Sequence, residues 1–283
     1  MPLNPLNTFY IKTKDFLVSG EEFRIVSNSR NDVLETTPKP KPENLPNYYK
    51  SDAYISHTDT KNDFLSKAYH AVKRVALKQK VSLIFKENKG VGKLLDIGSG
   101  TGDFLLTAKQ KKWEVYGVEP DEGARMLSEK KGVTVLKELQ QIRQKNFDVI
   151  TLWHVLEHVP DLETYILEIS KLLKPSGTLI VAVPNFKSWD AKHYQYFWAA
   201  YDVPRHLWHF SKTAIHSLFS KHQFQLIKIK PMVFDAFYVS LLSEKYKTGK
   251  NNWAKALFFG CCSNVSGIFT KEYSSHIYVL KKG

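Results

Sequence analysis

The chain has 283 residues, 43% of them hydrophobic, which suits one large domain or one domain with appendages and excludes global disorder. Its two cysteines, Cys261 and Cys262, are adjacent, so they build neither a disulfide framework nor a zinc site, and a reducing compartment is expected. With 41 basic and 28 acidic residues, the formal charge of +13 attracts polyanions without choosing among them. We expect no secretory, transit or transmembrane segment and therefore a cytoplasmic protein.

The first part of the chain reads as an appendage. Residues 9–35 alternate apolar and polar positions, which predicts a small hairpin. Four prolines between residues 38 and 46 then predict an extended connector. From Phe64 to Leu77, apolar residues recur at helical spacing, with Thr60 or Asn62 as a cap. A helix is therefore expected just ahead of the first core strand.

The stretch Leu94–Phe104 reads LLDIGSGTGDF, a short apolar strand followed by a glycine turn and the start of a helix. Such a turn brings backbone N–H groups close to a ligand, because no Cβ stands in the way. The dinucleotide pattern G-x-G-x-x-G would require glycine at position 103, where the chain has Asp103. The turn predicts a nucleotide-type site of another kind.

Strand and helix signals alternate after this turn, as a doubly wound sheet requires. Further strands are expected at 113–120, 132–139, 147–153 and 178–185, the last after a helix and a Pro-Ser-Gly turn at 175–177. Strands six and seven are expected at 224–232 and 274–282 and would pair antiparallel. Between them, residues 233–272 read as an insertion with two apolar helical stretches.

Asp96 stands just ahead of the first glycine, and the pattern D-x-G-x-G-x-G resembles motif I of the class I S-adenosylmethionine-dependent methyltransferases. Residues 148–159 (D-V-I…L-E-H-V) and 174–179 (K-P-x-G-x-L) resemble later motifs of that family in order and spacing, over roughly residues 90–230. The resemblance implies an α/β, Rossmann-like, doubly wound seven-stranded sheet with helices on both faces. That sheet would be mostly parallel with its last strand antiparallel, and it would carry an N-terminal extension and a C-terminal lid insertion.

The resemblance also implies S-adenosyl-L-methionine as cofactor, S-adenosyl-L-homocysteine as product and no metal. Asp96 would hold the glycine loop and the cofactor's ammonium end, and Glu119, at the end of the second strand, would accept hydrogen bonds from both ribose hydroxyls. The fourth strand ends where ligands bind in such sheets. The expected cofactor-binding residues are Asp96, Gly98, Ser99, Gly100, Gly102, Glu119, Trp153 and His154.

The segment DVPRHLWHFS (202–211) is the expected acceptor side. Arg205 could clamp a carboxylate or phosphate, and the candidate catalytic bases are His206, His209 and His154. Tyr49 and Tyr54 are further substrate-binding candidates. The alternative is that Arg205 forms a structural ion pair with Asp202 and that the histidines cap a lid helix.

Two absences narrow the chemistry. No Asn-Pro-Pro-aromatic tetrad, typical of amide or adenine-amino methylation, follows the fourth strand, and no cysteine nucleophile lies in the core. Oxygen is therefore the favoured acceptor atom. The N-terminal hairpin resembles the zinc ribbon of some bacterial family members, but Asn28 and Asn31 replace its cysteines, so no metal is expected there.

These patterns predict two parts, an N-terminal extension over 1–45 and a methyltransferase domain over 46–283, with its core at 90–230, its lid at 233–272 and its last strand at 275–282. The first functional hypothesis is methyl transfer to oxygen of a small-molecule acceptor. The alternatives are a lipid-like or membrane-associated acceptor, which implies peripheral membrane contact, and a non-catalytic nucleic-acid-binding protein with a Rossmann-like core. The sequence leaves the acceptor and the oligomeric state open.

Overall fold

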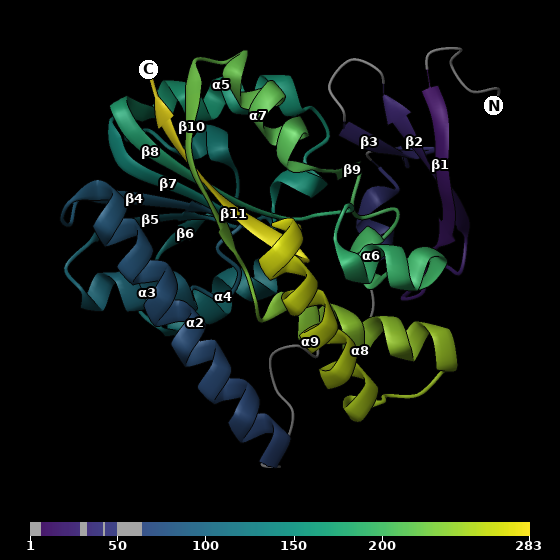
Figure 1. The fold of residues 1–283 in the computed structure, drawn as a ribbon. Helices are drawn as coiled ribbons and strands as arrows, with labels where there is room; N and C mark the ends of the chain where they lie inside the picture. The colour runs from purple at the N-terminus through teal and green to yellow at the C-terminus, as the bar shows by residue number, and fades with distance from the viewer. Residues whose placement is uncertain (1–6, 29–32, 42, 50–63) are drawn as a thin grey trace.

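The computed structural model describes residues 7–28, 33–41, 43–49 and 64–283. Its centre is a seven-stranded sheet in the order β10-β11-β8-β7-β4-β5-β6 (Figure 1). The strands are β4 (Lys93–Ile97), β5 (Glu114–Val118), β6 (Val135–Leu136), β7 (Phe147–Trp153), β8 (Leu173–Pro184), β10 (Phe224–Pro231) and β11 (Ser275–Lys282). Only β11 runs antiparallel to its neighbours, β8 and β10, whereas the pairs from β8 through to β6 are parallel. The Rossmann-like α/β prediction is confirmed.

Helices cover both faces of this sheet. They are α2 (Phe64–Asn88), α3 (Asp103–Gln110), α4 (Glu122–Lys130), α5 (Leu162–Leu172) and α7 (Lys212–Ser220). Leu94 of β4 packs with α2 and α3 in one buried cluster, whereas the next residue, Leu95, packs with α5 and α7 in another. Because successive strand side chains point to opposite faces, this alternation explains why Leu94, Leu95 and Ile97 read as a strand buried on both sides.

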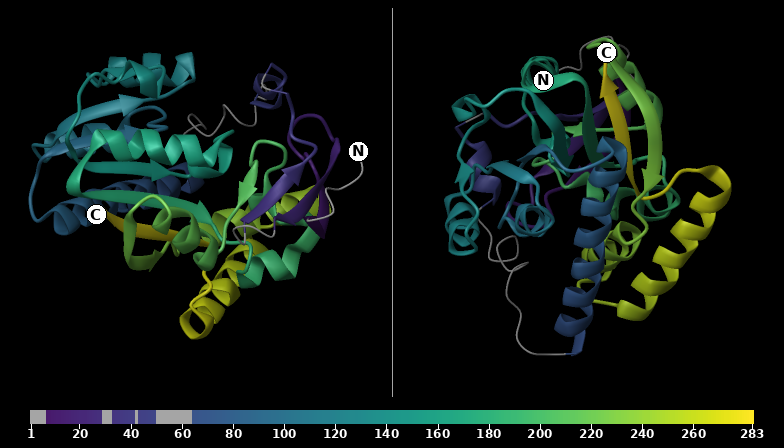
Figure 2. Two further views of the ribbon diagram at one scale, coloured as in Figure 1. Left: turned by 90° about the horizontal axis from the view of Figure 1, so that it is seen from above. Right: turned by 90° about the vertical axis from the view of Figure 1, so that its left-hand side faces the viewer.

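The N-terminal strands form a second sheet rather than a hairpin. β1 (Asn7–Lys14), β2 (Glu22–Asn28) and β3 (Val33–Thr37) form an antiparallel meander, and β9 (Trp208–His209) joins its edge. The hairpin prediction fell short because the N-terminal segment makes three strands, of which β3 continues past residue 35. The fourth strand, β9, contributes only two residues, from a segment read as acceptor-binding. Figures 1 and 2 show this sheet beside the large one, with α6 (Trp189–Tyr194) next to it.

Two core elements differ from their predicted form. The third parallel strand, β6, has two residues, because a 3-10 turn, η2 (Leu139–Gln141), follows almost at once. The expected turn at 175–177 lies inside β8 as an irregularity. Phe147 pairs with Leu173 while Val149 pairs with Thr178, so the strand takes up extra residues between these pairs.

The insertion before β11 is a helical hairpin of α8 (Asp235–Thr248) and α9 (Trp253–Thr270). It lies on the side of the sheet from which β11 enters, which is the carboxyl end of the parallel strands (Figures 1 and 2). Ser263 of α9 donates a hydrogen bond to the buried carboxylate of Asp190, which also accepts one from Trp198. Among the described residues, no helix is both long and apolar enough to cross a membrane.

Candidate cofactor and acceptor site

The glycine turn after β4 packs tightly against other residues at its first and last glycines, whereas its middle glycine has free space beside it. Gly98, Gly100 and Gly102 all have positive φ, at 70°, 53° and 76°. A Cβ on Gly98 would lie 2.4 Å from Val155 Cγ2, and one on Gly102 would lie 2.2 Å from Ser128 Oγ. At Gly100 a Cβ would meet nothing within 4 Å. The outer glycines are therefore required for packing, and the middle one faces space that a ligand can fill.

Hydrogen bonds connect the turn to the second parallel strand, β5. The backbone N–H groups of Gly98 and Ser99 both donate to the carbonyl of Val118, at 2.8 and 3.0 Å. Glu119 follows that strand, and its carboxylate accepts from the backbone of Gly100 at 2.8 Å and of Asp121 at 2.9 Å. Burial raises the pKa of Glu119, although these two hydrogen bonds oppose the rise. Glu119 thus stands beside the open middle of the turn.

Asp96 lies beneath the turn and is 2% exposed. Its Oδ1 accepts a hydrogen bond from Thr151 at 2.6 Å. Burial raises the pKa of Asp96 to about 7, although that hydrogen bond and the nearby charge of Lys80 oppose the rise. The ammonium group of Lys80 lies 4.2 Å from the centre of the Trp153 ring. A cation beside this carboxylate would favour its charged form.

Two polar atoms around the turn are buried without a hydrogen-bond partner among the described residues: Ser99 Oγ and Trp153 Nε1. Buried polar groups are normally paired, so unpaired ones require a physical reason. Trp153 is the last residue of β7, the strand next to β4. Unpaired donors at the carboxyl ends of adjacent strands are consistent with a ligand-binding crevice.

His154 follows β7 with φ of 58°, a conformation that is costly for a residue with a Cβ. Its Nδ1 lies 3.3 Å from Glu157 Oε1, and its Nε2 lies 3.0 Å from Asp235 Oδ2. Burial alone would lower the pKa of His154, but the two carboxylates raise it to about 10. A protonated imidazole held on both sides orients its neighbours and cannot accept a proton from a substrate.

Arg205 is 1% exposed and its donors are used within the protein. Nε and Nη2 donate to the carboxylate of Asp202, Nη2 also donates to Asp15 at 2.9 Å, and Nη1 donates to the carbonyl of Tyr48 at 2.8 Å. This geometry corresponds to the structural ion pair rather than to a clamp for a substrate anion. Arg205 fastens the N-terminal sheet and its connector to the loop that precedes β9.

The other two histidines of the segment differ in their surroundings. His209 is 4% exposed, and its Nε2 lies 3.0 Å from the hydroxyl of Thr36, which itself donates to the carbonyl of His206. Burial lowers the pKa of His209 to about 3, so it is a neutral packed ring rather than a base near pH 7. His206 lies next to His158, with ring centres 4.7 Å apart. It is therefore His206 and not His209 that belongs to a polar cluster.

Of the two tyrosines expected on the acceptor side, Tyr49 ends the short helix η1 (Leu45–Tyr49), and its hydroxyl lies 3.1 Å from His158 Nδ1. Tyr54 lies outside the described residues. The sequence analysis did not select Asp235 or Lys80, which both contact the end of β7. No pattern in the sequence connects these residues to β7, because only the folded insertion and the folded α2 bring them there.

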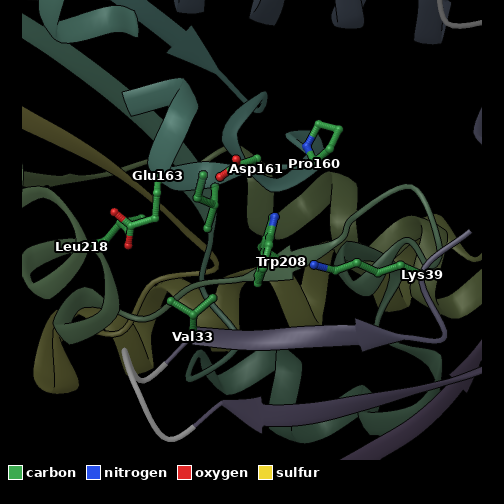
Figure 3. Close-up of a pocket in the computed structure, with 8 residues that line it drawn as sticks. Val33, Lys39, Pro160, Asp161, Glu163, Trp208 and Leu218 are labelled. Carbon is green, nitrogen blue, oxygen red and sulfur yellow. The ribbon is translucent and has the colours of Figure 1, made fainter. Parts of the chain in front are cut away.

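A surface cavity lies apart from these residues, between the N-terminal sheet and the start of α5 (Figure 3). Lys39 lies over the ring of Trp208 there, 3.5 Å from its centre. Its lining residues are Val33, Lys39, Pro160, Asp161, Leu162, Glu163, Trp208 and Leu218. Of the expected acceptor segment 202–211 only Trp208 lines it, and none of the cofactor-binding or catalytic candidates does. The candidate site is therefore defined by the strand ends and not by this cavity.

The fold and the turn define a Rossmann-like α/β protein with a glycine turn at the carboxyl end of β4, the arrangement of class I methyltransferases. The chain belongs to the methyltransferase domain family, whose model matches residues 69–229, more than half of the chain. The expected family resemblance is thereby confirmed.

Curated relatives are similar over a shorter stretch. The chain is 34% identical over 113 residues to a protein from Histophilus somni named ubiquinone biosynthesis O-methyltransferase, a match that covers 34% of this chain and 48% of the relative. A protein of the same name from Saccharophagus degradans is 32% identical over 103 residues, covering 33% of this chain and 44% of the relative. The matches thus span about half the length of these relatives.

Solved structures share the fold at low sequence identity. A magnesium protoporphyrin IX methyltransferase from Synechocystis has a TM-score of 0.57 and 14% identity, with 86% of this chain and 100% of that chain covered. A geranyl diphosphate C-methyltransferase from Streptomyces coelicolor has a TM-score of 0.56 and 12% identity, covering 80% and 88%. These likenesses concern the fold alone.

The buried ion pairs of Arg205 predict a large stability effect. Replacing Arg205→Met would leave the carboxylates of Asp15 and Asp202 without their cation, so we expect the free energy of unfolding to fall by about 3–5 kcal/mol. The control is Lys12→Met, because Lys12 forms an exposed pair with Glu22 in the same N-terminal sheet. That change should cost about 1 kcal/mol or less. Urea unfolding of both variants measures the difference, and equal midpoints would contradict the structural role of Arg205.

Proposed function

We propose that this chain binds S-adenosylmethionine at the carboxyl ends of β4, β5 and β7 and transfers its methyl group to an oxygen of a small-molecule acceptor. The observation that carries the proposal is the convergence of Asp96, the open Gly100 and Glu119 around one turn. Membership of the methyltransferase family supports the same cofactor.

The residues present fit this cofactor. The free space at Gly100 would admit the methionine portion of the molecule, and the carboxylate of Asp96 would face its ammonium group. Glu119 would exchange its bond to the Gly100 backbone for the ribose hydroxyls. Ser99 Oγ and Trp153 Nε1 would gain the polar partners that the described residues do not give them.

The cofactor supplies an electrophilic methyl group on a sulfonium centre, so the chain's main task is to align the acceptor with it and to exclude water. His154, held between two carboxylates, would fix the acceptor side of the crevice. His209 is hydrogen-bonded to Thr36, and Arg205 is paired with its carboxylates. Besides His154, the histidines next to the acceptor space would therefore be His206 and His158.

Oxygen is the favoured acceptor atom for two reasons. The curated relatives are named O-methyltransferases, although they match only part of the chain. The Asn-Pro-Pro-aromatic tetrad typical of amide or adenine-amino methylation does not follow β7, where the sequence is LWHVL. Both observations support a hydroxyl acceptor and neither identifies the molecule.

Glu119 tests the cofactor part of the proposal. Replacing Glu119→Ala removes charge-assisted hydrogen bonds to the ribose, so we expect S-adenosylhomocysteine to bind more weakly by about 1.5–3 kcal/mol. Glu114→Ala is the matched control, because Glu114 begins the same strand and is exposed. Calorimetric titration of both variants, with melting curves to establish folding, measures the effect. An unchanged affinity in Glu119→Ala would remove Glu119 from the site.

The acceptor class is tested by following a labelled methyl group. The purified protein is incubated with methyl-labelled S-adenosylmethionine and a bacterial cell extract, which is then separated into small-molecule, lipid, protein and nucleic-acid fractions. We expect the label in the small-molecule or lipid fraction, in an ether or ester linkage. Label confined to nucleic acid or protein, or carried on nitrogen or sulfur, would contradict the proposal, and salt-dependent RNA binding without transfer would favour the non-catalytic hypothesis.

A lipid-like acceptor at a membrane surface is the second candidate, and helix α9 favours it. The buried face of α9 consists of small residues, Ala256, Gly260, Ser263 and Gly267. Phe259 packs against Trp189 and His193, but most of the large apolar side chains of α9 face solvent. These are Trp253, Leu257, Phe258, Val265, Ile268 and Phe269, the last 81% exposed. This is the reverse of a helix that packs its apolar face inward, and such a surface indicates an interaction site.

The charges near α9 favour an anionic lipid surface as its partner. The helix contains no acidic residue, and the exposed Lys250, Lys255 and Lys271 lie in or beside it. Apolar side chains flanked by lysines are typical of helices that lie in a membrane interface. Asp235, the first residue of α8, contacts His154, so the hairpin that would touch the membrane is joined to the candidate site.

Vesicle sedimentation tests this second candidate. We expect the protein to sediment with vesicles that contain phosphatidylglycerol and much less with pure phosphatidylcholine, and the double variant Phe258→Ser/Phe269→Ser should lose this binding. The control is Phe85→Ser, because Phe85 is also about half exposed but lies on α2. Equal binding by all variants would exclude α9 as the contact. A dimer that dissociates in the double variant would instead make the face a subunit interface.

A further inference from the structure

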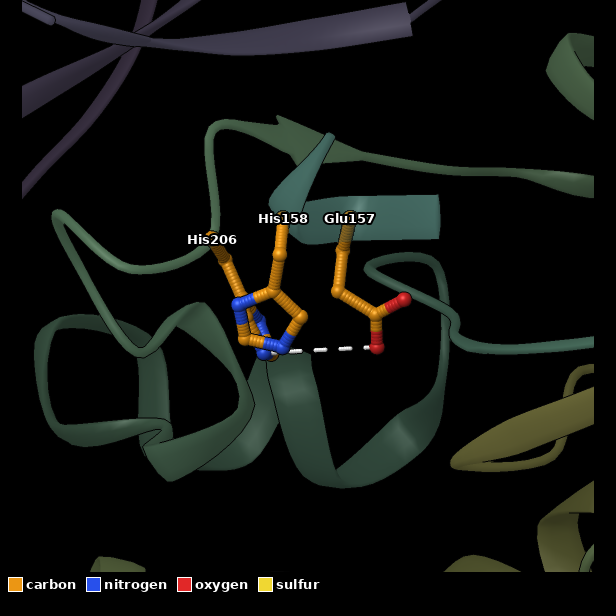
Figure 4. A group of neighbouring side chains, drawn as sticks. All are labelled: Glu157, His158 and His206. Carbon is orange, nitrogen blue, oxygen red and sulfur yellow. Dashed lines mark ion pairs between the residues drawn. The ribbon is translucent and has the colours of Figure 1, made fainter. Parts of the chain in front are cut away.

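Three side chains next to the candidate site bring ligand atoms together. Glu157 and His158 come from the 3-10 turn η3 (Leu156–His158) that follows β7, and His206 comes from the loop before β9. One ligand atom from each lies within 4.8 Å of the other two. Figure 4 shows the Nε2 sides of both rings turned toward the Glu157 carboxylate. These three residues are called the His2Glu cluster below.

The protons on the two rings follow from their carbonyl partners. His158 Nδ1 lies 3.1 Å from the carbonyl oxygen of Arg205 and also 3.1 Å from the hydroxyl of Tyr49, which can accept as well as donate. His206 Nδ1 lies 2.9 Å from the carbonyl oxygen of Ala200. A carbonyl only accepts hydrogen bonds, so each Nδ1 carries the proton. In the neutral rings both Nε2 atoms are therefore lone pairs. A backbone carbonyl that holds Nδ1–H is the usual way in which proteins orient a histidine that binds metal through Nε2.

The third member of the cluster is an acceptor as well. The Glu157 side chain is 1% exposed, and its Oε1 lies 4.0 Å from His206 Nε2, too far for a hydrogen bond. His154 Nδ1 lies 3.3 Å from Oε1, while Oε2 is buried with no hydrogen-bond partner among the described residues. Two lone pairs and a carboxylate thus face one another, and Asp202 Oδ2 lies 3.9 Å from His206 Nε2. In the part of the chain that the structure describes, no donor lies between the two Nε2 atoms and Glu157, and this arrangement favours a cation.

We propose that the His2Glu cluster binds one divalent transition-metal ion of the zinc type, through His158 Nε2, His206 Nε2 and Glu157. Two histidines and one glutamate are a ligand set of catalytic zinc sites, in which a fourth position stays open. Zinc bonds to nitrogen and oxygen ligands are about 2.0–2.2 Å long, so the 4.0 Å separation of His206 and Glu157 would shorten slightly on binding. His158 is only partly buried, which leaves a route to the cluster.

A metal at this position would complement the acceptor side of the crevice. Coordination lowers the pKa of a hydroxyl or of water, so an acceptor oxygen on the open position would need no histidine base. This agrees with His154 and His209, which are both held by protein partners. The role in catalysis rests on the proposed methyl transfer, whereas metal binding itself does not.

Cobalt titration tests the site without any assay of activity. The chelator-treated full chain is titrated with Co²⁺, whose visible absorption reports coordination by protein ligands, and Zn²⁺ is then added in competition. We expect one equivalent of Co²⁺ to bind, Zn²⁺ to displace it, and the spectrum to be lost in His206→Ala. His222→Ala is the control, because His222 also pairs with a glutamate, Glu163, but away from the cluster. It should bind as the unaltered protein does.

A second variant keeps the test decisive if His206→Ala does not fold. His206→Cys retains a metal ligand at the same position, and a cysteine bound to Co²⁺ adds an intense thiolate band in the near ultraviolet. A structural role of residue 206 would not produce this band. The proposal is overturned if the unaltered protein takes up no Co²⁺ or Zn²⁺ at one equivalent, or if His206→Ala binds as well as His222→Ala. In either case Glu157, His158 and His206 are a packed polar cluster that binds no metal.

Discussion

The close packing of the glycine turn after β4 is the constraint on which the site depends. Gly98 packs against Val155 in the loop after β7, and Gly102 packs against Ser128 of α4. At both positions the turn therefore requires a residue without a Cβ. These contacts hold the turn from two sides and leave Gly100 facing free space. A rigid backbone with one open position is suited to hold a ligand in a fixed orientation, which is what an in-line displacement requires.

A second fixed point lies across the crevice, at Arg205. Its guanidinium joins Asp15, in the turn after β1, to Asp202, and its carbonyl oxygen lies 3.1 Å from His158 Nδ1. The N-terminal strands therefore also have a structural role at the site. They hold the loop that presents His206, so the geometry of the acceptor side depends on a sheet that lies far away in sequence.

The core could be predicted from sequence because its signals are local. Buried strands, a glycine turn and helical spacing are each contained in a few residues, and residues 90–230 follow them in order. Less could be predicted where partners are distant. The two-residue β9 is too short to give a strand pattern in the sequence. An arginine at position 205 fits a substrate anion and the Asp15 carboxylate equally well, so its partner could not be predicted. Asp235 reaches His154 only because the insertion folds. The His2Glu cluster joins residues from two separate loops, so no spacing in the sequence reveals it.

Binding of the cofactor to the purified protein tests the central claim most directly. Calorimetric titration with S-adenosylmethionine, S-adenosylhomocysteine and NAD compares the proposed ligand, its product and a dinucleotide that suits a different glycine pattern. Saturable one-to-one binding of the two sulfur compounds, with none of NAD, is the predicted result. Failure of both to bind a folded protein would contradict the account, and binding of NAD alone would place the turn after β4 in a different class of Rossmann-like proteins.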